Sequence, residues 1–273
     1  MKYGLIAGSG RFPILALETA RELGHEVVVI AIQEEAAPEL ELLAARTHWI
    51  SLGALSKLIE ILKEEGITEV IMAGQVKHTK IFSAIRPDWR LAKLLFSLDT
   101  KNTDALIGGV AKLLADEGIT LGDSTRLLKP LVAGEGVLTK RKPTSEEQRD
   151  IDYGRRLAHA LSAVDIGQSV AISDKACVAL EAMEGTDAML RRAASLVEGR
   201  SLRLVKASGR RRHLQFDVPV VGPSTITTMA ETGTTALAVD AGRTLLLDRA
   251  ELIELAGAHG ITIVGYPSLE ADA

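Results

Sequence analysis

Short, dense runs of apolar residues alternate with stretches of helical spacing in the first half of the chain. The runs YGLIAG, EVVVIAI and TEVIMAG predict strands over residues 3–7, 26–32 and 68–72. Between them, the spacing predicts a helix near 13–23 and another through Leu55, Ile59 and Leu62 that ends at Gly66. Continuous Val and Ile runs are typical of strands buried on both faces. The pattern therefore predicts a Rossmann-like parallel sheet, with ligands at the carboxyl ends of its strands.

A charged stretch with few apolar residues, TKRKPTSEEQRD, interrupts this pattern at 139–150. Such a composition is typical of a linker, and the next segment is an amphipathic helix through Leu157 and Leu161. We therefore predict a Rossmann-like N-terminal domain over 1–138, a linker over 139–150 and a C-terminal catalytic domain over 151–273.

The second half of the chain has a different pattern of apolar residues. The segment SVAISDKACVALEA predicts two strands joined at Asp174-Lys175, and ALAVDAGRTLLLD predicts a second hairpin around Ala241-Gly242. Helices over TDAMLRRAASLVEG and DRAELIELAGAHG separate these strands. The C-terminal domain is accordingly predicted to be α+β, with a mixed sheet.

Composition narrows the class of protein. The chain has 273 residues, 47% of them hydrophobic, which is enough for two compact cores and excludes global disorder. Its 32 basic and 36 acidic residues give a net charge of −4, so no overall basic field favours nucleic acid. The single Cys177 excludes an intramolecular disulfide and indicates a reducing compartment. Without a signal or spanning segment, we expect a cytoplasmic protein whose contact with a membrane is peripheral.

A glycine-rich loop, Gly8-Ser9-Gly10-Arg11, follows the first predicted strand and opens a helix. Its backbone N–H groups and the helix dipole can hold a phosphate, and Arg11 adds a cation. The dinucleotide-binding pattern is incomplete, because Pro13 replaces the third glycine. The alternative is a tight strand-to-helix turn with Pro13 near the first helical position.

Gln75 and Lys77 follow the strand predicted at 68–72. They should project at the same sheet edge as the glycine loop, where Gln75 can bind a base or sugar and Lys77 a phosphate. The alternative is a solvated basic loop.

Two polar segments of the second half are candidates for chemistry. Glu184, Thr186 and Asp187 surround the start of a predicted helix, where capping competes with binding of an anionic group and with a divalent ion near Glu184 or Asp187. Farther on, Lys206 and Arg210–Arg212 place four cations within seven residues, shortly before Asp217. A carboxylate beside cations suits phosphoryl chemistry, as a metal ligand or an activator of water. The alternative is a solvated hairpin tip.

Eight segments, in order along nearly the whole chain, resemble one family. The family is the UDP-2,3-diacylglucosamine pyrophosphatases of lipid A biosynthesis, in the form unrelated to calcineurin-like phosphoesterases. The segments are IAGSGRFP, AGQVK, RPDWR, TDALIGG, EGVLTKR, IGQSVAI, EGTDAM and FDVPVVGPSTI.

The resemblance implies a two-domain, Mg²⁺-dependent hydrolase. It would cleave UDP-2,3-diacylglucosamine, held between the domains, to UMP and 2,3-diacylglucosamine 1-phosphate. Asp217 matches the acid that the family needs for hydrolysis, and Lys206 matches a basic residue upstream of it. The chain departs from the family in the segment Ser208-Gly209-Arg210-Arg211-Arg212, where Lys-Pro-x-Gln-Asp is expected.

On this basis we expect Asp217 and Lys206 to be catalytic and Asp217, with Glu184, to bind Mg²⁺. The expected substrate-binding residues are Gly8, Ser9, Gly10, Arg11, Gln75, Lys77, Thr186, Asp187 and Thr225. An acylated substrate implies transient contact with the inner membrane surface, and length does not decide between a monomer and a homodimer. Two alternatives stay open: an NAD(P)-dependent oxidoreductase and a non-catalytic module that binds a nucleotide sugar or lipid.

Overall fold

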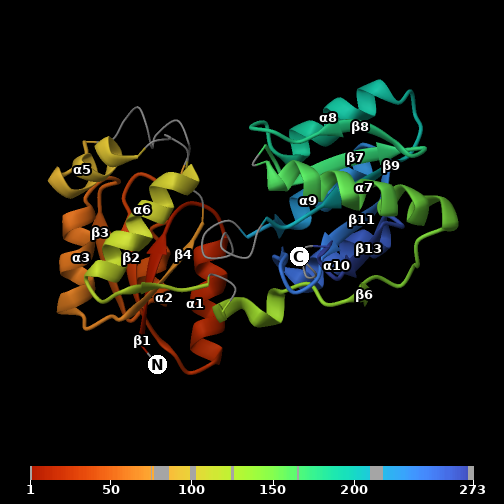
Figure 1. Ribbon diagram of the computed structural model, residues 1–273. Coiled ribbons are helices and arrows are strands. Elements are labelled where there is room, and N and C mark those ends of the chain that lie inside the picture. Colours follow the sequence, from red (N-terminus) through yellow and green to blue (C-terminus); the bar gives the residue numbers. More distant parts are fainter. Residues whose placement is uncertain are drawn as a thin grey trace. The chain divides into compact units, whose positions relative to one another are not determined.

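The computed structural model divides the chain into two compact units, residues 1–128 and 129–273 (Figure 1). It describes residues 2–74, 76, 86–98, 103–123, 126–164, 166–209 and 218–269. The predicted residues Gln75, Lys77 and Asp217 lie outside these ranges, as do Arg210–Arg212. No helix in the described ranges is long and apolar enough to cross a membrane.

Unit 1 contains a parallel sheet with the strand order β3-β2-β1-β4-β5, as in Rossmann-like folds. The predicted strands and helices are confirmed, most closely at β2, which has the predicted bounds. The elements are β1 (Lys2–Ala7), α1 (Phe12–Glu22), β2 (Glu26–Ile32), α2 (Leu40–Leu43), β3 (Arg46–Ile50), α3 (Leu55–Glu64), β4 (Glu69–Ala73), α5 (Trp89–Ser97), α6 (Thr103–Asp116) and β5 (Thr120–Leu121).

Unit 2 contains a mixed sheet with the order β6-β13-β11-β9-β7-β8, which confirms the predicted α+β class. A 3₁₀ helix, η1 (Arg126–Leu131), spans the division between the units. The other elements are β6 (Gly136–Val137), α7 (Ser145–Ala163), β7 (Ser169–Ser173), β8 (Ala176–Leu180), α8 (Thr186–Leu196), β9 (Leu202–Lys206), β10 (Val220–Val221), α9 (Pro223–Glu231), β11 (Thr234–Asp240), β12 (Leu245–Leu246), α10 (Arg249–Ala258) and β13 (Thr262–Tyr266).

The stretch predicted as a linker, 139–150, lies within unit 2. Its charges are used locally, because Thr144 and Glu147 form a capping box at the start of α7. Both guanidinium Nη atoms of Arg141 donate to the Glu147 carboxylate at 2.8 Å. A run of charged residues therefore starts a helix here, and the division between the units falls earlier, after Leu128.

The hairpin predicted at Asp174-Lys175 is confirmed. β7 and β8 are antiparallel, and both turn residues have positive φ, as a tight two-residue turn requires. The second predicted hairpin, around Ala241-Gly242, is wrong. β11 pairs in parallel with β9 and β13, whereas β12 pairs with β10. The apolar runs on both sides of Gly242 belong to two different sheets, so their proximity in sequence does not indicate pairing.

Helices cover both faces of the unit 2 sheet. On one face, α7 packs on β7, β9 and β11 around a small core. Gly154 permits this contact, since a Cβ there would lie 2.7 Å from Val205 and 2.8 Å from Ile172. On the other face, α8, α9 and α10 build the larger core. Each of α9 and α10 ends a few residues before the next parallel strand begins, so both start near the edge where β9 and β11 end.

Candidate functional site

In unit 1, the glycine loop and the end of β4 lie at the same edge of the sheet and are in direct contact. The Gly8 N–H donates to the Ala73 carbonyl at 2.9 Å. A Cβ on Gly74, whose φ is +92°, would lie 2.6 Å from the Ser9 carbonyl oxygen. Only glycine fits this approach, so the two loops form one backbone surface at the carboxyl edge of the sheet.

The start of α1 completes this surface. Arg11 occupies the N-cap position without a side-chain capping hydrogen bond, and Pro13 lies in the first turn. The exposed Arg11 side chain and the amino end of α1 together favour an anion. Gln75 and Lys77, predicted for the same edge, lie outside the described residues.

In unit 2, polar residues occupy the ends of three neighbouring strands, β7, β9 and β11, at one edge of the sheet. Lys206 is the last residue of β9 and Asp240 the last of its parallel neighbour β11. Ser169, the first residue of the antiparallel β7, lies opposite Lys206. This edge therefore brings together side chains from segments far apart in the sequence, in the position where open α/β sheets bind ligands.

Lys206 is 8% exposed, and its ammonium takes part in a network of hydrogen bonds. Its Nζ donates to Thr186 Oγ1 at 3.0 Å, and that hydroxyl donates to Glu181 Oε1 at 2.9 Å. Ser169 Oγ lies 3.4 Å from the same hydroxyl. This network holds the nearly buried ammonium of Lys206 at the sheet edge. Its low exposure to water strengthens its interaction with an anion.

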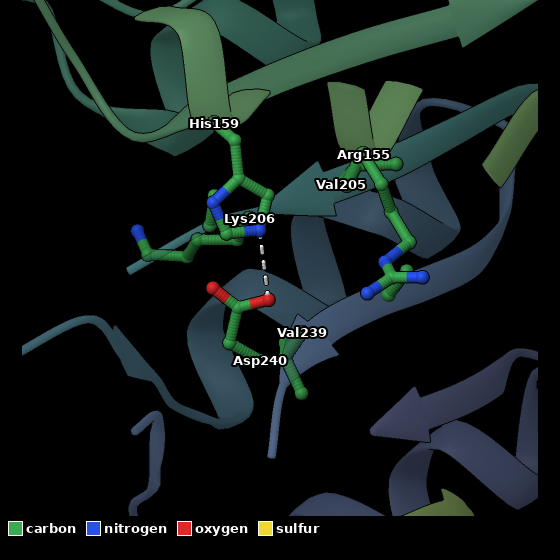
Figure 2. Close-up of a pocket in the computed structure, with 8 residues that line it drawn as sticks. Arg155, His159, Val205, Lys206, Val239 and Asp240 are labelled. Carbon is green, nitrogen blue, oxygen red and sulfur yellow. Dashed lines mark hydrogen bonds and ion pairs between the residues drawn. The ribbon is translucent and has the colours of Figure 1, made fainter. Parts of the chain in front are cut away.

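Asp240 organises the neighbouring part of the edge (Figure 2). This carboxylate is 2% exposed and accepts from the Ser208 N–H at 2.7 Å and the Ser208 hydroxyl at 2.8 Å. Its other oxygen lies 3.2 Å from His159 Nε2 on α7. Burial disfavours the charged form, yet the hydrogen bonds from His159 and Ser208 outweigh it and hold the pKa of Asp240 below its ordinary value. Asp240 thus anchors the turn that follows Lys206.

Lys206, Asp240 and His159 line one pocket. Figure 2 shows the Asp240 carboxylate directed at the His159 ring, with Arg155 also on the wall. The Arg155 guanidinium lies 4.5 Å from the ring centroid of Tyr266. Within the described residues, His159 Nδ1 is buried without a hydrogen-bond partner. Two cationic side chains, Lys206 and Arg155, therefore lie close to the Asp240 carboxylate at this edge of the sheet, and the cavity between them has no free volume for a ligand.

The start of α8 does not use Thr186 or Asp187 as a helix cap, which was one of the two interpretations of the sequence. Gly185 is the N-cap and makes no side-chain hydrogen bond, so neither Thr186 nor Asp187 caps the helix. The Thr186 hydroxyl is used between Lys206 and Glu181 instead. One oxygen of Asp187 is buried without a hydrogen-bond partner in the described part of the chain. Thr186 is therefore part of the hydrogen-bond network of Lys206, and the carboxylate of Asp187 is not used as a helix cap.

Glu184 has a local partner. Its carboxylate binds Arg192 Nη2 at 2.7 Å and the Ala182 N–H at 3.0 Å, and the hydrogen bond from Arg192 lowers its pKa. The described ranges contain no group of three His, Cys, Asp or Glu side chains that could hold a metal ion. Asp217, the other predicted metal ligand, lies outside those ranges. The ion pair with Arg192 makes Glu184 a poorer metal ligand than its sequence position suggests.

Thr225 lies in the first turn of α9, and its N–H donates to the Gly222 carbonyl at 3.1 Å. The helix has no side-chain cap. Since α9 starts near the edge where β9 ends, Thr225 is compatible with the predicted binding role.

Sequence reasoning missed Asp240, His159, Ser208 and Glu181. A signal for Asp240 existed, because it follows the buried run TTALAV at the end of a strand. Because a hairpin was predicted around Ala241-Gly242, Asp240 was assigned to the turn and not to a ligand-binding strand end. His159 and Glu181 become recognisable only when α7 packs on β9 and β8 joins the sheet next to β7.

Comparison with known proteins covers both units. Residues 2–131 match the family model of the LpxI N-terminal domain, and 134–264 match that of the LpxI C-terminal domain. The UDP-2,3-diacylglucosamine pyrophosphatase LpxI of Caulobacter vibrioides is 33% identical over 279 residues, which cover 98% of this chain and 99% of that protein.

Two of the solved structures that resemble this chain do so distantly. A nucleoside-diphosphate-sugar epimerase from Pseudomonas aeruginosa has a TM-score of 0.28 at 15% identity, covering 44% of this chain and 31% of its own. The biotin carboxylase domain of a thermophilic 2-oxoglutarate carboxylase has a TM-score of 0.29 at 12% identity, and the match covers 72% of this chain and 32% of that chain. These scores are too low to indicate a shared fold.

Proposed function

Because the chain belongs to the LpxI family, both of whose domains it contains, we propose that it is a hydrolase acting in lipid A biosynthesis. The reaction is cleavage of UDP-2,3-diacylglucosamine to UMP and 2,3-diacylglucosamine 1-phosphate. Water adds to one phosphorus, and the bond from that phosphorus to the bridging oxygen breaks. The observation that supports this best is the nearly buried Lys206 ammonium at the unit 2 sheet edge.

Diphosphate hydrolysis needs positioning and charge stabilisation more than covalent chemistry. Lys206 supplies a fixed cation for the charge that develops on the phosphate, and Thr186 orients it. Asp240 holds the turn at Ser208 that follows Lys206 in the chain. Asp217 comes nine residues after Ser208, and we propose that it prepares the attacking water.

Residues of both units contribute to substrate binding in this proposal. The loop Gly8–Gly10 and Arg11 bind the UDP portion together with Gln75 and Lys77. In unit 2, Thr186, Asp187 and Thr225 bind around the diphosphate and the sugar. The direct contact between the glycine loop and Ala73 supports the first assignment, since it creates a single backbone surface from two loops.

We propose Mg²⁺ as the cofactor, as the resemblance to the family implies. The donors available are carboxylate oxygens, which suit this hard cation. Glu184 is bound to Arg192, whereas Asp187 has a buried oxygen without a described partner, so Asp187 with Asp217 is the better pair. When bound, Mg²⁺ supplies neutralisation of phosphate charge.

We place the reaction on the cytoplasmic side of the inner membrane, consistent with the single free thiol, Cys177. Contact with that membrane is transient and peripheral in this proposal. A homodimer stays a prediction.

The test is UMP release from UDP-2,3-diacylglucosamine, with Mg²⁺ or with EDTA, for the wild type and for Asp217→Ala. We expect wild-type release that needs Mg²⁺, and a loss of about a thousandfold in kcat for the variant while substrate still binds. Heavy-oxygen water locates the attacked phosphorus, because the label enters either UMP or the lipid phosphate.

Each other result decides against part of the proposal. Equal turnover by Asp217→Ala removes Asp217 from the mechanism. Binding of UDP-2,3-diacylglucosamine without product contradicts hydrolysis and supports a non-catalytic module. No UMP release together with thermal stabilisation by NAD(P) supports the oxidoreductase alternative.

A further inference from the structure

Helix α5 presents large apolar side chains on two opposite faces. On the inner face, Leu91 and Leu94 are buried where α5 packs against α3 and α6. On the outer face, Trp89 is 67% exposed and Phe96 is 92% exposed. Single exposed apolar residues are common, but two aromatic rings on one nine-residue helix are unusual in a chain with only 3% aromatic residues.

The two rings share a face with cations. Trp89, Lys93 and Phe96 are spaced i, i+4, i+7, which places them on the same side of a helix. Lys93 is exposed between the rings, and Arg86 is exposed just before the helix. The Arg90 guanidinium lies 5.2 Å from the Trp89 ring centroid, within cation–π range.

The charge of this region is opposite to that of the whole protein. Residues 86–98 contain Arg86, Arg90 and Lys93 against Asp88, so their net charge is 3 − 1 = +2, whereas the chain carries −4. The Arg90 guanidinium forms an ion pair with Glu117 on α6, and the exposed cations are Arg86 and Lys93. Asp88 is turned inward, because its carboxylate accepts from the Leu91 and Ser56 N–H groups. The outer face of α5 therefore combines aromatic rings with basic side chains, as in helices that bind the interface of anionic membranes.

The position of α5 relates this face to the candidate site of unit 1. Asp88 contacts Ser56 in the first turn of α3, and the Asp88 N–H donates to Gly53, in the loop between β3 and α3. Both contacts lie beyond the carboxyl end of β3, so α5 starts at the sheet edge that carries the Gly8–Gly10 loop (Figure 1). A surface held by α5 would thus lie beside the proposed nucleotide-binding edge.

We propose that the outer face of α5, formed by Trp89, Lys93 and Phe96 with Arg86, docks on the surface of an anionic phospholipid bilayer. Its role rests on the proposed function, because a substrate with two acyl chains resides in a membrane. The rings enter the headgroup region, and the basic side chains bind lipid phosphates. Docking keeps the nucleotide-binding edge of unit 1 next to the lipid that supplies the substrate.

Trp89 itself reports on docking. The chain has two tryptophans, so Trp49→Phe leaves Trp89 as the only one. We expect its fluorescence to shift to shorter wavelength with vesicles of phosphatidylcholine and phosphatidylglycerol, and to shift less with phosphatidylcholine alone. Salt should weaken the effect. An unchanged spectrum with the anionic vesicles overturns the proposal.

Variants locate the surface. The double variant Trp89→Ser/Phe96→Ser should lower partitioning to anionic vesicles, measured by co-sedimentation, by about tenfold or more, and Lys93→Glu by a smaller factor. The matched control is Met183→Ser, which removes an 89% exposed apolar side chain from unit 2 and should bind like the wild type. Circular dichroism confirms that each variant is folded.

Two results contradict docking through α5. The first is that the double variant partitions to anionic vesicles like the wild type, which would favour a protein partner for this face. The second is that Met183→Ser lowers partitioning as much as the double variant does. UMP release from detergent-dispersed UDP-2,3-diacylglucosamine separates this failure from failure of the proposed function. We expect the double variant to retain that activity. If the wild type releases no UMP, the proposed function fails, while the vesicle measurements still decide the docking.

Discussion

The two units offer a ligand different chemistry at equivalent places. In both, the candidate residues lie where parallel strands end. Unit 1 presents backbone, since Gly8 and Gly74 bring two loops into contact without large side chains. Unit 2 presents charge, because Lys206 and Asp240 are held nearly buried by hydroxyl, imidazole and backbone groups. In the proposed reaction, unit 1 would therefore recognise the substrate by shape, whereas unit 2 would stabilise the charge that develops on the phosphate.

The largest expected effect tests the charge of unit 2. Lys206→Met keeps the length of the side chain but removes the cation beside Thr186. We expect kcat for UMP release to fall about a thousandfold with a much smaller change in KM, since the cation acts mainly on the transition state. The control is Lys142→Met, which removes an exposed ammonium of the same unit. A change confined to KM would assign Lys206 to substrate binding alone.

The second largest effect on kcat is expected from Asp240, whose carboxylate holds the turn at Ser208 that follows Lys206. Asp240→Asn preserves shape but weakens the hydrogen bonds from Ser208 and His159. We expect kcat to fall about a hundredfold, and the free energy of unfolding at pH 7 to fall by about 2 kcal/mol. Ser208→Ala, which removes only one of these hydrogen bonds, should show a smaller loss.

The pH dependence of unfolding gives a second measurement on Asp240. Its pKa is lowered in the folded protein, so its stabilisation is present above the ordinary carboxyl pKa. It is lost as the pH falls through the lowered value. Urea unfolding should therefore show that the stability difference between wild type and Asp240→Asn shrinks below about pH 4. A constant difference down to pH 2 would contradict the ionised Asp240.

A moderate effect tests the shape of unit 1. Gly74→Ala places a Cβ 2.6 Å from the Ser9 carbonyl at a φ of +92°. We expect the loop to shift and KM to rise about tenfold, while kcat changes little. Gly24→Ala is the matched control, because Gly24 also has a positive φ, +69°, but has open space around its Cβ. If both variants raise KM equally, backbone strain rather than the loop contact is responsible.

Sequence patterns predicted unit 1 more fully than unit 2. In unit 1 the apolar runs predicted three strands of the parallel sheet, β1, β2 and β4, together with the loop at Gly8–Gly10, whereas β3 and the two-residue β5 were not predicted. In unit 2, β10 and β12 are two residues each and pair across a long separation, which no local pattern reveals. The network at Asp240 joins three elements, and its members are 32 and 81 residues away in sequence. Lys206 was predicted as a site residue because it lies in a cluster of charges and matches a basic residue of the family.

The smallest expected effect separates two carboxylates at the start of α8. Glu184 is bound to Arg192 on the surface, whereas Asp187 has a buried oxygen without a described partner. Glu184→Gln should change kcat by less than about twofold and leave the Mg²⁺ dependence as in the wild type, since exposed ion pairs contribute little.

Asp187→Asn should raise the Mg²⁺ concentration needed for half-maximal activity by about tenfold, because one anionic donor is lost. The same titration on both variants decides between the two carboxylates. A raised requirement in Glu184→Gln alone would show that Arg192 releases Glu184 when the metal binds. If the Mg²⁺ requirement is unchanged in both variants, neither Glu184 nor Asp187 binds the metal together with Asp217.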